Sequence, residues 1–137
     1  RGSQDFIDTV LGIVSKDEPV STFNHNDLMR DINASLAPFR KTQGTAMAGF
    51  GQLAKAAITD GALSAKHKEL VALAIAVTQR CSGCIGFHVK ALVQLGCTRT
   101  ELEEMLSVCV YMGGGPALMY AAEAIAAWEK MVPAEQA

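Results

Sequence analysis

Two cysteines and a histidine stand close together in the middle of the chain. Cys81-Ser82-Gly83-Cys84 places two thiols three residues apart, and His88 follows Cys84 by one helical turn. Residues four apart share a helix face, so we expect Cys84 and His88 to be neighbours. Amide N–H groups at a helix start favour a thiolate, and an imidazole can take the thiol proton. A thiolate attacks a peroxide oxygen to give a sulfenic acid, which a second thiol converts to a disulfide. The spacing therefore predicts thiol redox chemistry at Cys81 and Cys84.

Glu69 is the candidate partner of His88. It lies near the middle of the helix expected before Cys81, about 15 Å from the end of that helix. If the next helix folds back antiparallel, a contact between Glu69 and His88 becomes feasible, and it would orient the imidazole and increase its basicity. The competing interpretation is a solvated helix residue beside Lys66 and Lys68.

The elements that must position these residues are predicted to be helices throughout. Apolar residues recur with helical spacing from Asn26 onward, and no sustained alternation indicates a strand. The first apolar stretch, Phe6 to Val14, is compatible with a short helix or an extended arm. The next helix is expected from Asn26 or Asp27 to about Leu36, where Pro38 stops it. Further helices are expected from Ala46 to Ile58, from Ser64 to about Arg80, and from Cys81–Gly83 to Leu95. The last two run from Arg99 to about Tyr111, after the Thr98–Glu101 capping box, and from Ala117 to Met131, after Gly113-Gly114-Gly115-Pro116.

These elements predict an all-α bundle of about six helices in one domain. We expect residues 26–132 to form the helical domain and residues 1–25 to be an N-terminal extension. Residues 1–3 resemble a vector remnant because they lack an initiator methionine. The extension includes His25, to which the pattern assigns no role.

Composition and charge exclude several classes of function. A formal net charge of −2 provides no basic footprint for nucleic acid. The longest uninterrupted apolar run, Leu70 to Val77, is too short to cross a bilayer, and the N-terminus lacks the pattern of a signal peptide. A cytoplasmic location is therefore expected, where a close cysteine pair is more often catalytic or metal-binding than structural. Cys97 and Cys109 are interpreted as inert packing thiols.

The last predicted helix indicates self-assembly. Between Ala117 and Trp128 it is apolar on nearly every side, with Glu123 as its only charge. A helix without a polar face is usually covered on several sides. In a chain of this size a neighbouring subunit is the expected second cover, which predicts a homo-oligomer.

The pattern Glu69-x11-Cys81-x2-Cys84-x3-His88 resembles the signature of the alkylhydroperoxidase D-like group of the carboxymuconolactone decarboxylase superfamily. The resemblance extends from about Asp27 to Trp128. It implies a thiol-dependent peroxidase without a bound cofactor, in which Cys84 attacks the hydroperoxide, Cys81 resolves it, and Glu69 and His88 relay protons. It also implies a dithiol reductant, such as a lipoylated protein, and assembly into trimers or hexamers.

Three alternatives follow from the same residues. The best-known peroxidases of the group carry a histidine immediately before the second cysteine, where this chain has Gly83; that difference leaves room for a thiol–disulfide exchange protein or redox sensor with little turnover. Zinc could use Cys81, Cys84 and His88, but the usual second pair of ligands is missing. A non-redox, lactone-processing relative is the third, although such enzymes lack the cysteine pair.

Overall fold

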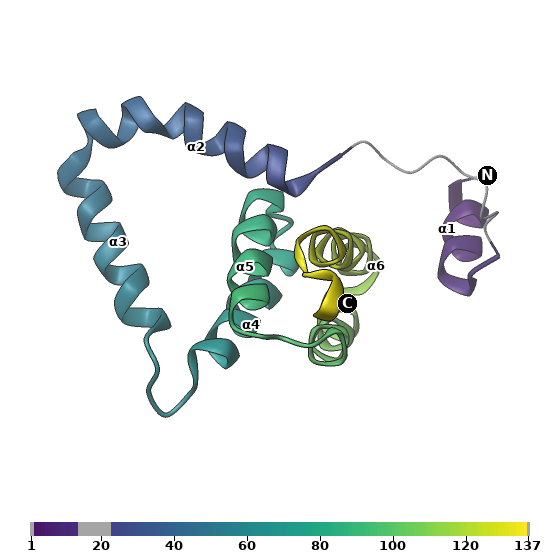
Figure 1. Ribbon diagram of the computed structural model, residues 1–137. Coiled ribbons are helices and arrows are strands. Elements are labelled where there is room, and N and C mark those ends of the chain that lie inside the picture. Colours follow the sequence, from purple (N-terminus) through teal and green to yellow (C-terminus); the bar gives the residue numbers. More distant parts are fainter. Residues whose placement is uncertain (1, 14–22, 137) are drawn as a thin grey trace.

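The computed structural model describes residues 2–13 and 23–136, and this part of the chain contains helices and no strand. The all-α prediction is therefore confirmed. Figure 1 shows the arrangement, with α1 and the long α2–α3 segment on either side of a bundle made by α4, α5 and α6. The helices are α1 (Gly2–Leu11), α2 (His25–Thr42), α3 (Gly44–Ile58), α4 (Ala65–Thr78), α5 (Ser82–Gln94), α6 (Arg99–Met131) and the short 3-10 helix η1 (Ala134–Gln136).

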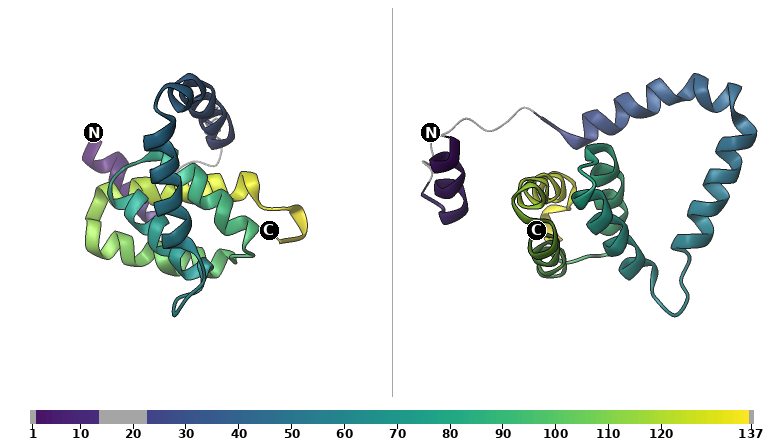
Figure 2. Two further views of the ribbon diagram at one scale, coloured as in Figure 1. Left: turned by 90° about the vertical axis from the view of Figure 1, so that its left-hand side faces the viewer. Right: turned by 180° about the vertical axis from the view of Figure 1, so that it is seen from behind.

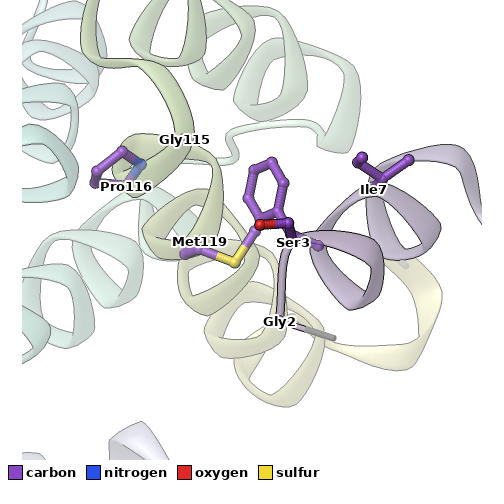
Figure 3. Close-up of a pocket in the computed structure, with 7 residues that line it drawn as sticks. Gly2, Ser3, Ile7, Gly115, Pro116 and Met119 are labelled. Carbon is purple, nitrogen blue, oxygen red and sulfur yellow. The ribbon is translucent and has the colours of Figure 1, made fainter.

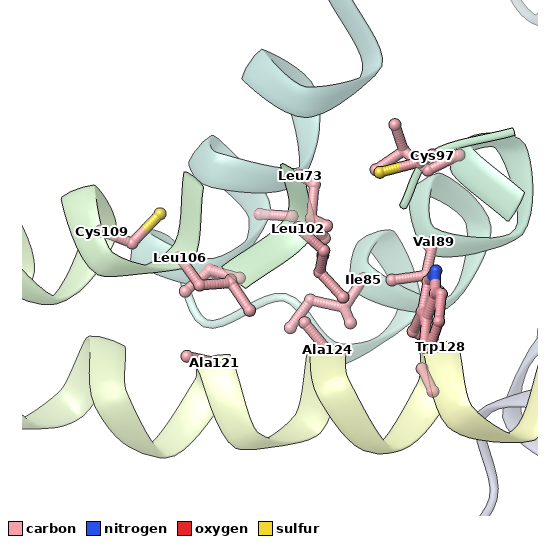
Figure 4. Packing of buried hydrophobic residues seen from close by; sticks show 14 of the residues in the cluster. Leu73, Ile85, Val89, Cys97, Leu102, Leu106, Cys109, Ala121, Ala124 and Trp128 are labelled. Carbon is pink, nitrogen blue, oxygen red and sulfur yellow. The ribbon is translucent and has the colours of Figure 1, made fainter. Parts of the chain in front are cut away.

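The hydrophobic core lies where α4, α5 and both halves of α6 meet. Each of these helices begins at a residue whose side chain accepts a hydrogen bond from the first turn: Ser64, Cys81 and Thr98. Their inward faces carry aliphatic side chains and one indole, packed as Figure 4 shows. The most deeply buried large side chains of the cluster are Leu73, Val77, Ile85, Val89, Leu92, Leu102 and Trp128.

The two helices expected on either side of the glycine-rich segment form α6, which turns sharply between them. Gly114 interrupts the helix with φ 71° and ψ −154°. Beyond it the chain folds back on itself. The reversal brings Arg99, near the start of α6, to 3.0 Å from Glu129, near its end. By length and composition α6 could cross a membrane, but the reversal lets both halves face one core instead. The predicted break is confirmed.

The end predicted near Leu36 for the helix that begins at Asn26 or Asp27 was wrong. Pro38 lies inside α2, which continues to Thr42. A proline removes one backbone hydrogen bond, so a carbonyl one turn earlier loses its partner. Here that carbonyl belongs to Ala34, which is exposed and open to water. Nearby, the Arg40 guanidinium donates to the Asn33 side chain at 3.0 Å. Water can therefore satisfy the Ala34 carbonyl, which lets the helix continue past the proline.

The first turn of α2 is anchored to the second half of α6. The His25 ring is 1% exposed, and its Nε2 lies 3.0 Å from Glu123 Oε1. Lys130 Nζ donates to the Phe23 carbonyl at 2.5 Å. His25, to which the sequence assigned no role, is thus a structural residue. Its partner is Glu123, the only charged residue between Ala117 and Trp128.

The fold depends on the backbone at Gly114. Its combination of φ and ψ is accessible essentially only to glycine, so a Cβ there imposes strain of about 1–3 kcal/mol. We expect Gly114→Ala to reduce the free energy of unfolding in urea by that amount. Gly44→Ala is the matched control, since an added Cβ at Gly44 meets nothing within 4 Å. Equal stability of the two variants would contradict this account of the turn.

Candidate redox site

Cys81 and Cys84 form a disulfide at the N-terminus of α5. Their Cα atoms lie 5.2 Å apart. Cys81 is the N-cap, and its Sγ accepts a hydrogen bond from the Cys84 amide at 3.2 Å. The first amide groups of α5 therefore point at the sulfur pair, where they favour negative charge. The two cysteines that the sequence identified as a candidate redox pair are therefore joined to each other.

A histidine–carboxylate pair lies one turn further along α5. His88 Nδ1 is 2.6 Å from Glu69 Oε2, so the contact expected from the sequence is present. Glu69 is 6% exposed, and a buried carboxylate is retained when a strong donor satisfies it. An ionised carboxylate only accepts hydrogen bonds, which places the imidazole proton on Nδ1. Nε2 is then the basic atom of His88, on the helix face that it shares with Cys84.

The tight connection from α4 to α5 brings these four residues together. The Cys81 amide donates to the Ala76 carbonyl at 3.0 Å, and the Arg80 amide donates to Val77 at 3.2 Å. This is the hydrogen-bond pattern of a Schellman motif, with Arg80 in the left-handed conformation at φ 59°. The chain reverses within three residues, so α5 runs back along α4 and His88 comes level with Glu69. No glycine marks this turn in the sequence.

Solvent exposure distinguishes the cysteines. Cys84 is exposed and Cys81 is half-buried, while Cys97 and Cys109 are buried and free. Burial raises the pKa of the Cys97 thiol and of the Cys109 thiol. Raising the pKa keeps both thiols protonated and unreactive at neutral pH. Their expected role as packing residues agrees with this environment.

Gly83, between the two cysteines, is covered by α2. A Cβ added there would lie 2.8 Å from Ile32 Cδ1, and one added at Gly86 would lie 3.1 Å from Met29 Cγ. The two glycines let α2 approach α5 closely. Ile32 therefore occupies the space beside the disulfide into which a larger residue at position 83 would extend.

Within the described residues, neither a metal-binding group nor the apolar pocket beside α1 involves these four candidate residues. Within residues 2–13 and 23–136, no three histidine, cysteine or acidic side chains are grouped closely enough to hold a metal ion. An open apolar pocket of about 600 Å³ lies between α1 and the start of the second half of α6, lined in part by Phe6, Pro116 and Met119 (Figure 3). None of the four candidate residues lines it.

Fold and site together define a small all-helical protein with a CxxC disulfide beside a histidine–glutamate pair. Residues 44–127 match the carboxymuconolactone decarboxylase family, and the chain belongs to that family.

One solved structure and two curated proteins are also similar to this chain. A carboxymuconolactone decarboxylase family protein from Legionella pneumophila, solved in its apo form, is 53% identical with a TM-score of 0.78, covering 80% of this chain and 97% of its own. An uncharacterised protein of Cupriavidus necator is 38% identical over 75% of this chain and 91% of its own length. An uncharacterised protein of the cox locus of Paracoccus denitrificans is 30% identical over 75% of this chain and 93% of its own.

Differential alkylation tests the exposure of the cysteines. After reduction, we expect iodoacetamide at neutral pH to modify Cys84 first and to leave Cys97 and Cys109 unmodified until the protein is unfolded, since burial raises the pKa of both thiols. Peptide mass spectrometry over a time course provides the measurement. Modification of Cys97 or Cys109 at the rate of Cys84 would refute the assignment.

Proposed function

We propose that this protein is a thiol-dependent peroxidase that reduces organic hydroperoxides in the cytoplasm. The observation that carries the proposal is the position of an exposed Cys84 one turn before His88, whose other ring nitrogen is held by the buried Glu69. This arrangement provides a reachable sulfur, a base on the same helix face, and a carboxylate that fixes the tautomer of the base.

The reaction divides into three balanced steps. His88 accepts the Cys84 proton, and the thiolate attacks the outer oxygen of ROOH. The O–O bond breaks, Cys84 becomes a sulfenic acid, and the alkoxide takes the proton to leave as ROH. Cys81 then attacks the sulfenic sulfur, releasing water and forming the Cys81–Cys84 disulfide. A dithiol reductant, such as a lipoylated protein, reduces the disulfide by exchange and is itself oxidised.

The distribution of exposure supports the roles of the two cysteines. The attacking sulfur has to meet both the peroxide and the reductant, and Cys84 is the exposed member of the pair. The resolving sulfur needs only to reach Cys84, and Cys81 already lies within bonding distance while half-buried. Family membership is compatible with this function and also with a non-redox activity.

Cysteine substitutions test the proposal. We expect Cys84→Ser to abolish consumption of cumene hydroperoxide in the presence of a dithiol. Cys81→Ser should form a sulfenic acid but no intramolecular disulfide, because the resolving thiol is missing. Cys97→Ser is the control and should retain activity. Mass spectrometry of the oxidised wild-type protein should map the disulfide to Cys81 and Cys84.

Other outcomes of these assays would select other functions. Rapid disulfide formation with negligible turnover by any reductant would identify a redox sensor or exchange protein. Linkage through Cys97 or Cys109 would overturn the site assignment. Activity on a lactone that survives loss of both cysteines would identify a non-redox enzyme.

The role of Glu69 is to position His88. We expect Glu69→Gln to slow the oxidation of Cys84 by a factor on the order of 100, because the amide no longer enforces the reactive tautomer. The deficit should shrink as pH rises, since hydroxide then forms the thiolate without a base. Glu123→Gln is the matched control because it alters the other histidine–carboxylate pair and should leave the rate unchanged. A deficit that is constant across pH would indicate structural damage instead.

A further inference from the structure

The outward face of α5 carries an aromatic residue beside the groups of the proposed chemistry. Successive residues of a helix are turned by about 100°, so Phe87 lies between Gly83 and Cys84 around the axis of α5, and His88 lies beyond Cys84. The buried residues of α5 lie on its opposite side. Phe87 is 37% exposed, which is unusual for so large an apolar side chain.

The surroundings of α5 leave this face open within the described part of the chain. The helix packs against α2, α4 and α6. Figure 1 and the right-hand view of Figure 2 show α2 crossing near one end of α5, while α3 stands apart from it. Cys84 is exposed on this face as well. A molecule from solution can therefore meet the sulfur of Cys84 and the ring of Phe87 together.

The ring of Phe87 is directed toward the sulfur pair by helix geometry. Long side chains on a helix lean toward its N-terminus, so each covers the turn that precedes its own Cα. For Phe87 that turn contains Gly83 and Cys84. Gly83 has no side chain that would occupy the same space. We therefore expect the ring to lie over the first turn of α5, next to the reactive sulfur.

Ile32 of α2 brings a second apolar group to the same turn. A Cβ added at Gly83 would lie 2.8 Å from Ile32 Cδ1. This methyl group is therefore nearer to Phe87 than to His88 around the helix axis. The contact of His25 with the second half of α6 anchors the start of α2. Ile32 is thus held in place by the fold.

The surroundings of Cys84 are divided by chemistry. On one side His88 and the carboxylate of Glu69 lie 2.6 Å apart and handle protons. On the other side Phe87 and Ile32 supply an aromatic ring and an aliphatic chain, neither of which can exchange a proton. An organic hydroperoxide, ROOH, has the same division, because its oxygen atoms exchange a proton and its group R avoids water.

We propose that Phe87 is a specificity-determining residue of this site and that, together with Ile32, it binds the group R of the hydroperoxide. The inference rests on the proposed peroxidase function. The outer oxygen meets Cys84, and the inner oxygen takes the proton that His88 holds. R is bonded to the inner oxygen, and contact with the neighbouring ring removes R from water. Hydrogen peroxide has no such group and gains nothing from the ring.

Rates of Cys84 oxidation by two peroxides test the role of Phe87. Disulfide formation in a single turnover, followed by quenching and mass spectrometry, requires no reductant. We expect Phe87→Ala to slow the reaction with cumene hydroperoxide about tenfold, the lower end of the effect of an apolar contact on specificity. The rate with hydrogen peroxide should not change.

Three further variants control this measurement. Phe87→Leu keeps an apolar side chain and should retain most of the rate with cumene hydroperoxide. Ile32→Val removes the Cδ1 atom beside Gly83 and should give a smaller loss in the same direction. Phe50→Ala is the matched control, since Phe50 is a 69% exposed phenylalanine on α3, and it should change neither rate.

A probe without peroxide chemistry separates this inference from the proposed function. N-benzylmaleimide and N-methylmaleimide both alkylate the Cys84 thiolate in the Cys81→Ser variant, and the ratio of the two rates measures apolar contact beside the sulfur. We expect Phe87→Ala to reduce this ratio several-fold.

The possible results lead to different conclusions. Equal slowing of both peroxides by Phe87→Ala, or an unchanged rate with cumene hydroperoxide, would overturn the inference and leave the proposed function intact. If neither peroxide oxidises the wild-type protein, the proposed function fails, and with it the binding of ROOH. A maleimide ratio that still falls in that case would show that the apolar contact beside Cys84 stands.

Discussion

A carboxylate buried between two helices must be paired, and the site depends on how Glu69 is paired. Taking a charged oxygen out of water costs several kcal/mol unless a strong donor replaces the lost hydration. His88 supplies that donor at 2.6 Å, which couples the packing of α4 against α5 to the orientation of the imidazole. The same contact that satisfies a buried carboxylate therefore also orients the imidazole, which lies on the helix face that carries Cys84.

The connection between α4 and α5 sets this register. Arg80 adopts a left-handed backbone conformation, and α4 ends in a Schellman motif immediately before Cys81. As a result Cys81 becomes the N-cap of the next helix, and its sulfur lies where the amide groups converge. Core contacts from Leu73 and Ile85 then hold the two helices together. The Cys81–Cys84 disulfide and the His88–Glu69 pair thus belong to one helical hairpin.

The single chain has two regions of different character. Residues of α4, α5 and α6 enclose a hydrophobic core around Trp128, whereas no residue of α3 is fully buried. The two regions meet where Ile32 lies against Gly83, beside the disulfide. Small residues at positions 83 and 86 make this approach possible. A glycine within the redox motif therefore has a packing role, and its presence is explained by the helix that covers it.

The sequence by itself determined the helical class, the cap residues Ser64 and Thr98, the break before Pro116 and the candidate redox residues, because these depend on local spacing and side-chain chemistry. The tertiary structure decided the rest. The extension of α2 through Pro38 depended on the exposure of Ala34 to solvent, and the burial of His25 depended on Glu123, a partner far away in the chain. The pairing of Glu69 with His88 was feasible from the sequence but required the actual reversal at Arg80. These features depend on contacts between residues that are distant in the chain, and the local sequence pattern does not specify such contacts.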